Sequence, residues 1–259
     1  MSRYADIQDE PIHKLLVPIQ GYQDQELVSL EESIKPIAQL FDDLEMHVWI
    51  AKQNCQAPVD NLTQDKSAAI YLYTMEFDSS KSFYRLLNVA LRSENRRSIV
   101  PWSSYLKLFM TALYKLPSKP QIVYRGVKGI DLSDKYLKGK HFAWWGVSSC
   151  TTTVDVLQEE QFLGQNGERI LFNIECSNGQ SIKSHSYYSD KEEEVILMPG
   201  SYFEVRGHLN SGHGLRIIQL QEIEPKYPLV RPPFSKALVD NTNRREAGKH
   251  LGKDTNRDF

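Results

Sequence analysis

The chain of 259 residues is predicted to adopt an α+β fold, with helices first and a mainly antiparallel β-sheet second. Before Pro120, apolar residues recur at steps of three and four, as in amphipathic helices. After Pro120, short apolar runs alternate with Gly, Ser, Asn and Asp, which is typical of strands joined by turns. Apart from residues 154–163, no helical pattern separates one strand from the next, so a doubly wound fold is disfavoured.

The first half contains several candidate helices. One or two are expected between Leu27 and Val48, where Pro36 should start a new turn or a kink. Another should begin after Thr63, a residue type that caps helix N-termini well. Two further apolar-sided segments cover residues 82–92 and 101–116. The candidate strands of the second half cover residues 122–124, 142–147, 170–174, 195–198, 202–205 and 215–220.

Composition excludes several classes of protein. A hydrophobic content of 41% is enough for a sizeable core, and a net charge of −2 gives no basic field for nucleic acid. No stretch approaches the ~18 apolar residues of a membrane span, and no secretory signal precedes residue 10. The cysteines, Cys55, Cys150 and Cys176, fit neither a disulfide framework nor a zinc site. We therefore expect an intracellular monomer without nucleic-acid or membrane partners, although secretion stays open.

The common nucleotide and metal signatures are missing. The sequence has no Gly-x-Gly-x-x-Gly after a strand and no phosphate-binding Gly-x-x-x-x-Gly-Lys-Ser/Thr. His208 and His213 stand five apart in a glycine-containing turn with no third ligand nearby, so solvated turn histidines are favoured over a metal site. No metal cofactor is expected.

Three clusters in the second half carry chemistry. Arg125 follows an apolar run and precedes Gly126, so it could offer a guanidinium fork to a phosphate, or simply pair with a surface acid. Residues 148–153 form a run of small hydroxyl side chains and a cysteine, which could hold a carboxylate or a ribose hydroxyl, or satisfy their own backbone. Trp144 and Trp145 before this run are more often core residues than a stacking platform.

The third cluster is the acidic run at residues 192–194, directly before the apolar Val195. If the backbone is already extended there, Glu192 and Glu194 lie on one face while Glu193 points away. An acidic run is usually a solvated loop, but acids next to a buried strand can have shifted pKa values.

In this order and spacing, Arg125, then Ser149-x-Thr151, then Glu192-x-Glu194, the chain resembles the arginine-specific mono-ADP-ribosyltransferases of the Arg-Ser-Glu class. The resemblance runs from about Leu62 to about Glu222. It implies a catalytic domain at 61–225 and leaves a helical extension at 1–60 outside it. Residues 226–259 are rich in polar residues and proline with few apolar residues, so a mobile polar tail is expected there. The family usually has Ser-Thr-Ser where this chain reads Ser149-Cys150-Thr151, so alignment onto Ser148 is the alternative.

The resemblance implies NAD as co-substrate and an arginine-bearing protein as acceptor. Glu194 would face the sugar cation, with Ser149 orienting it, and Glu192 would bind the acceptor guanidinium and take up its proton. Arg125 would hold the NAD phosphate or ribose and Gly126 the nicotinamide amide. Weaker candidates for the NAD pocket are Tyr73, Phe162 and Ser186, and the loop around Tyr187 and Tyr188 would contact the acceptor. The alternatives are an NAD glycohydrolase, a catalytically silent NAD- or ADP-ribose-binding module, and a secreted toxin.

Overall fold

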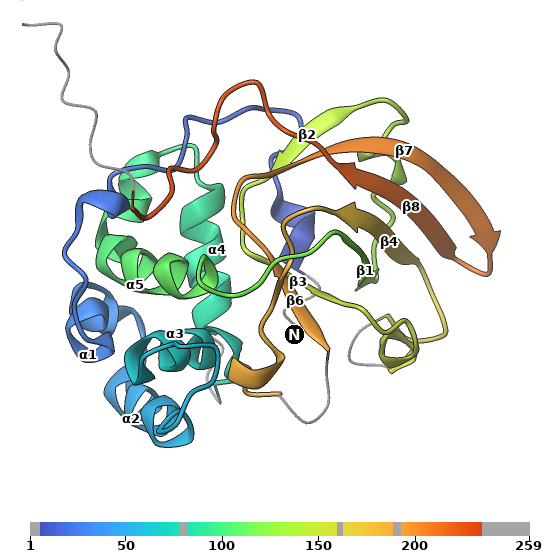
Figure 1. The fold of residues 1–259 in the computed structure, drawn as a ribbon. Helices are drawn as coiled ribbons and strands as arrows, with labels where there is room; N and C mark the ends of the chain where they lie inside the picture. Colours follow the sequence, from blue (N-terminus) through green and yellow to red (C-terminus); the bar gives the residue numbers. More distant parts are fainter. Residues whose placement is uncertain (1–5, 78–81, 160–162, 189–192, 235–259) are drawn as a thin grey trace, which may run out of the picture.

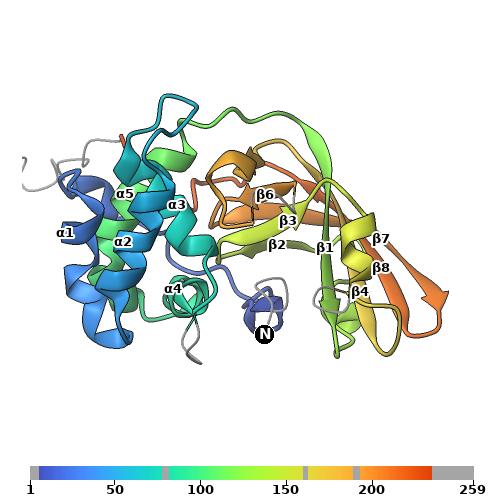
Figure 2. The ribbon, with the colours of Figure 1, turned by 90° about the horizontal axis from the view of Figure 1, so that it is seen from below.

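The computed structural model describes residues 6–77, 82–159, 163–188 and 193–234. Figures 1 and 2 show two parts: a group of helices from the first half of the chain, and beside it a curved sheet from the second half. Strands β3 and β6 lie between the helices and the long strands in both views. The predicted α+β order is confirmed.

The helices follow the predicted pattern with local changes. Pro36 does not kink one long helix but separates α1 (Leu30–Ile34) from α2 (Leu44–Asn54), because it lies in the intervening 3-10 turn η3 (Lys35–Leu40). Thr63 caps α3 (Gln64–Thr74) as predicted, since its side chain accepts a hydrogen bond from Lys66 N at 3.4 Å. The next elements are α4 (Phe83–Arg92), the 3-10 turn η4 (Arg96–Trp102) and α5 (Ser103–Leu113).

The sheet has the strand order β2-β7-β8-β4-β1-β3-β6-β5. Neighbouring strands are antiparallel except β4 and β8, which pair in parallel, so the predicted mainly antiparallel sheet is confirmed. The bounds are β1 Gln121–Lys128, β2 His141–Trp144, β3 Ser148–Thr151, β4 Arg169–Cys176, β5 Gln180–Ser181, β6 Glu194–Leu197, β7 Ser201–Gly212 and β8 Leu215–Glu222.

Three predicted elements of the strand half differ from the structure. Residues 142–147 form no single strand: β2 ends at Trp144, and β3 begins at Ser148 beside different neighbours. The helical pattern at 154–163 gives only the 3-10 turn η6 (Asp155–Gln158) among its described residues. His208 lies within β7, so only His213 is in the turn of the β7–β8 hairpin.

Two apolar cores lie on either side of the central strands. The helical core includes Tyr73, Phe109, Trp145, Val147 and Ile196, whereas the strand core includes Val123, Trp144, Cys150, Phe172 and Leu197. Adjacent residues of β3 and β6 therefore face different cores, as strand alternation requires. The sites that the sequence predicts lie where these two cores meet.

Candidate active site

Strands β1, β3 and β6 are neighbours in the sheet, so the three motifs lie on adjacent strands. Tyr124 lies opposite Thr151, and Thr151 lies opposite Glu194. Directly opposed residues in antiparallel strands have Cβ atoms about 4.5–5.5 Å apart and share one face of the sheet. The hydroxyl motif and the acidic motif therefore meet side by side.

The strand register decides which residues of the hydroxyl run face Glu194. Ser149 lies opposite Ile196 and Thr151 opposite Glu194, so both hydroxyl residues share the face of Glu194. Ser148 and Cys150 alternate onto the other face, where Cys150 packs in the strand core. The structure therefore favours Ser149 over Ser148, and it explains how a cysteine fits at the middle position.

Glu194 is fully buried, at 0% exposure, and receives a hydrogen bond from Ser186. The Ser186 hydroxyl donates to Glu194 Oε2 at 2.9 Å and accepts from the backbone N–H of Tyr188 at 3.2 Å. The sequence predicts that Ser149 orients Glu194, but the buried Ser149 Oγ has no hydrogen-bond partner within the part of the chain that the structure describes. Ser186 provides that contact instead, because its segment folds back over the start of β6.

Arg125, for which the sequence predicts a guanidinium fork toward a phosphate or a pair with a surface acid, is also fully buried. The reason is topological: β1 is an interior strand between β4 and β3, and Arg125 shares its face with Val123 and Val127 of the strand core. Its Nη1 donates to the carbonyl oxygen of Ser149 at 2.8 Å. Arg125 thus ties β1 to β3 at the candidate serine, and its contact with an NAD phosphate stays a prediction.

The Cys150 thiol lies within electrostatic range of both charged residues. Burial raises its pKa to about 12, the positive charge of Arg125 opposes this rise, and the negative charge of Glu194 adds to it. The charges of Arg125 and Glu194 are thus both close enough to Cys150 to affect the pKa of its thiol. The thiol stays neutral near pH 7, so the cysteine serves as a packing residue there.

Gly126 permits a close approach, as its position in the motif predicts. A Cβ added at Gly126 would lie 2.9 Å from the Cβ of Leu163, nearer than real Cβ contacts allow. The neighbour that occupies this space is thus the apolar side chain of Leu163. The contact of Gly126 with the nicotinamide amide stays a prediction.

Tyr73 lies in the helical core at 1% exposure. Its hydroxyl donates to the carbonyl oxygen of Val147 at 3.3 Å, and its ring packs near Phe109. Tyr73 thus holds the backbone directly before β3, the strand that carries Ser149, and its contact with NAD stays a prediction. Two other predicted residues, Phe162 and Glu192, lie outside the described residues.

The segment before β6 is anchored to α3 through residues that the sequence analysis did not single out. His185, at 2% exposure, contacts Ser67 Oγ through Nδ1 at 2.9 Å and Asp60 Oδ2 through Nε2 at 3.1 Å. Two residues further, the backbone N–H of Tyr187 donates to Thr74 Oγ1 at 2.8 Å. These contacts fix the backbone on both sides of Ser186.

The side chains of the Tyr187 loop are partly accessible, as predicted. Tyr187 is 44% exposed and packs edge-on against Tyr71 and Tyr188.

Among the described helices, none is long and apolar enough to cross a bilayer. Within the same residues, no group of three or more His, Cys, Asp or Glu side chains is arranged to hold a metal ion.

The sequence model of the family described as NAD:arginine ADP-ribosyltransferase matches residues 30–227, which is most of the chain. The chain belongs to this family. The matched residues begin before residue 61, where the catalytic domain is predicted to start, and include α1 and α2, while the division into domains stays a prediction. A search of curated proteins finds no match.

Several solved structures share the fold at low sequence identity. The type III effector XopAI from Xanthomonas axonopodis pv. citri superposes with a TM-score of 0.57 at 17% identity, over 79% of this chain and 92% of that one. The eukaryotic mono-ADP-ribosyltransferase ART2.2 gives 0.52 at 19% identity, over 76% and 85%. Vis toxin from Vibrio splendidus gives 0.50 at 21% identity, over 80% and 92%. These structures show the fold, and the family match makes this protein a transferase that uses NAD.

Proposed function

We propose that the protein transfers ADP-ribose from NAD to arginine side chains of proteins and releases nicotinamide. The observation that carries the proposal is the position of Glu194, a fully buried carboxylate at the start of β6, opposite Thr151 and bonded by Ser186. The description of the matched family, NAD:arginine ADP-ribosyltransferase, supports both the donor and the acceptor.

Cleavage of the bond between ribose C1 and the nicotinamide nitrogen sends the electron pair to nicotinamide and leaves positive charge on the sugar. A preplaced carboxylate stabilises such an oxocarbenium-like transition state. Glu194 fills this role. Ser149 Oγ, buried on the same face and without a hydrogen-bond partner in the described ranges, fits a contact with a ribose hydroxyl.

A guanidinium nitrogen of the acceptor then attacks ribose C1 and loses a proton. Arginine has a pKa above ~12, so a nearby acid must bind the group and take up this proton. We assign this role to Glu192. The exposed Tyr187, whose backbone is held by Thr74, supports contact of this loop with the acceptor protein.

The test is incubation with labelled NAD and agmatine, a small guanidino compound. Wild type should place label on agmatine and release nicotinamide, whereas Glu194→Gln should lose both activities by about 100-fold or more. Glu192→Gln should lose labelled agmatine but keep part of the nicotinamide release.

Each component of the proposal has its own contrary result. Nicotinamide release without labelled agmatine would identify an NAD glycohydrolase. Undiminished release by Glu194→Gln would remove Glu194 from the mechanism. Equal loss of both activities in Glu192→Gln would leave that residue without a special role toward the acceptor.

A further inference from the structure

Glu10 is a buried carboxylate outside the residues that match the family model, which begin at residue 30. It follows the 3-10 turn η1 (Asp6–Asp9) and lies between Ile7 and Ile12, which are both buried in the strand core. The Glu10 side chain has 0% exposure. Its burial is costly unless the carboxylate is paired and hydrogen-bonded.

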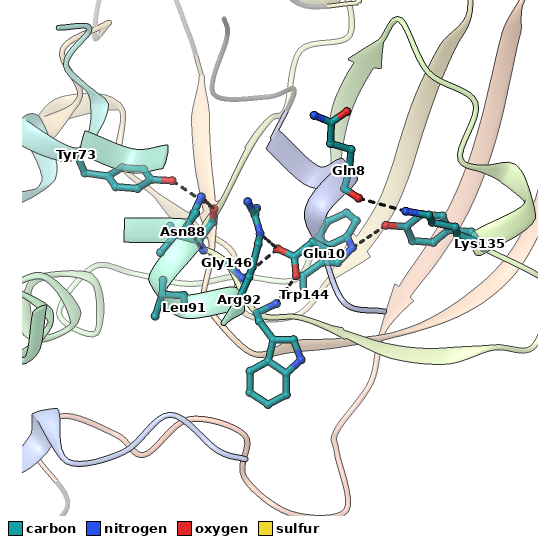
Figure 3. A network of polar contacts seen from close by, with 12 residues as sticks. Gln8, Glu10, Tyr73, Asn88, Leu91, Arg92, Lys135, Trp144 and Gly146 are labelled. Carbon is teal, nitrogen blue, oxygen red and sulfur yellow. Dashed lines mark hydrogen bonds and ion pairs between the residues drawn. The ribbon is translucent and has the colours of Figure 1, made fainter. Parts of the chain in front are cut away.

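The Glu10 carboxylate receives three donors. Oε1 accepts from Arg92 Nε at 2.6 Å and from the backbone N–H of Gly146 at 3.0 Å, and Oε2 accepts from the backbone N–H of Trp145 at 2.7 Å. Figure 3 shows the carboxylate between Arg92 and the backbone at Gly146. The side chain of Arg92, from the last turn of α4, is only 6% exposed. One carboxylate thus joins the N-terminal segment, α4 and the β2–β3 connection.

Gly146 gives these charged groups the space that they need. A Cβ added at Gly146 would lie 2.8 Å from Arg92 Nη2 and 2.9 Å from Glu10 Oε1. Because Arg92 Nε is bonded to Glu10 Oε1 at 2.6 Å, the two side chains hold each other and are not loose ends that can move away. The glycine that precedes the hydroxyl motif is therefore explained by the Glu10 contact.

The next residue, Val147, is fixed in the same way. Asn88 of α4 accepts from Val147 N at 2.8 Å and donates to Val147 O at 3.0 Å, and Tyr73 donates to that carbonyl as well. Three consecutive residues, 145–147, are thus held through their backbones by side chains from distant parts of the chain. Strand β3 begins directly afterwards at Ser148.

We propose that Glu10 is a positioning residue for the ADP-ribosyltransferase reaction. By holding Trp145 N and Gly146 N, it sets where β3 starts, and hence where Ser149 and Thr151 lie relative to Glu194. Displacements of about 1 Å at a site can cost about 100-fold in rate. This inference rests on the proposed function for its kinetic consequence, whereas the backbone contacts can be tested without it.

The main variant is Glu10→Gln, which has nearly the same shape. Two oxygens of Glu10 serve three donors, so either orientation of a glutamine amide turns its NH2 group toward one of them. We expect kcat for nicotinamide release to fall about 10- to 100-fold per folded molecule, with the KM for NAD changed less than about threefold. Hydrogen exchange at the Trp145 and Gly146 amides should become about tenfold faster.

Ile7→Val is the matched control, because it loosens the same segment without touching the carboxylate. It should lower thermal stability while leaving kcat and the exchange of both amides unchanged. If Glu10→Gln does not fold, Glu10→Asp, which keeps the charge but shortens its reach, is measured by the same two methods and should show the same losses.

Two results would overturn the proposal: a folded Glu10 variant with wild-type kcat and exchange, or an equal loss of kcat in Ile7→Val. If wild type releases no nicotinamide, the proposed function fails, but exchange at residues 145 and 146 still decides whether Glu10 holds this backbone.

Discussion

The two strands that carry the candidate site, β3 and β6, are fixed by different chemistry. The approach to β3 is held by a buried ion pair, Glu10 with Arg92, whose side chains are 0% and 6% exposed. The approach to β6 is held by hydroxyl groups and by His185, whose side chain is 1% exposed but bonded to an Asp60 side chain that is 41% exposed. The contacts that hold the backbone before β3, called here the β3 support, are thus enclosed by protein. The contacts before β6, the β6 support, reach the surface at Asp60.

The supports also act on different atoms. Glu10 and Asn88 bind the backbone before β3 and never touch the candidate serine, so they control position only. Ser186 binds the Glu194 carboxylate itself, so it controls both position and charge stabilisation. We therefore expect damage to the β3 support to lower both stability and, through the displacement of β3, kcat, whereas damage to the β6 support should act mainly on kcat.

The largest expected effect is from Arg92→Met. It leaves the Glu10 carboxylate buried without its cation, and breaking a buried pair in this way costs about 3–5 kcal/mol. The free energy of unfolding, measured by urea denaturation, should fall by about that amount. Glu94→Gln breaks the surface pair between Glu94 and Lys14, whose side chains are 61% and 51% exposed, and should leave the free energy of unfolding almost unchanged because water screens this pair. Similar values for both variants would remove the distinction between enclosed and surface support.

Ser186→Ala comes next and should act on the rate. A hydrogen bond to a charged group contributes about 1.5–3 kcal/mol, which corresponds to about a 10- to 100-fold loss of kcat if the bond acts in the transition state. Ser186→Thr keeps the hydroxyl and should recover most of the rate. Ser184→Ala changes an exposed hydroxyl of the same segment and should have no effect. A wild-type kcat for Ser186→Ala would show that β6 support is structural only.

The smallest effect is expected from Asp60→Asn. Its carboxylate is substantially exposed, so its pair with His185 is screened by water and should contribute about 0–1 kcal/mol to stability. Asparagine also keeps an oxygen that can accept from His185. A loss above about 2 kcal/mol in a thermal or urea unfolding curve would mean that the β6 support depends on charge as strongly as the β3 support does.

Local sequence patterns predict most of the fold correctly, because helix and strand periodicities reflect which face of each element is buried. The cap at Thr63 and the alternation that separates Ser149 from Cys150 are of this local kind. The continuous strand predicted over residues 142–147 is wrong for a nonlocal reason. The amides of Trp145 and Gly146 are bound by Glu10, which is remote in sequence and has no periodic signal.

The sequence by itself determined the order of helices and strands, the family, and the motifs around Arg125, Ser149 and Glu194. Only the tertiary structure decided that Arg125 is buried against Ser149, that Ser186 is the hydroxyl on Glu194, and that Glu10 holds the backbone before β3. The physical reason is that residue type and spacing fix local conformation and chemical capability. The partner of a buried polar group is instead set by which distant segments pack together, and that depends on the whole chain.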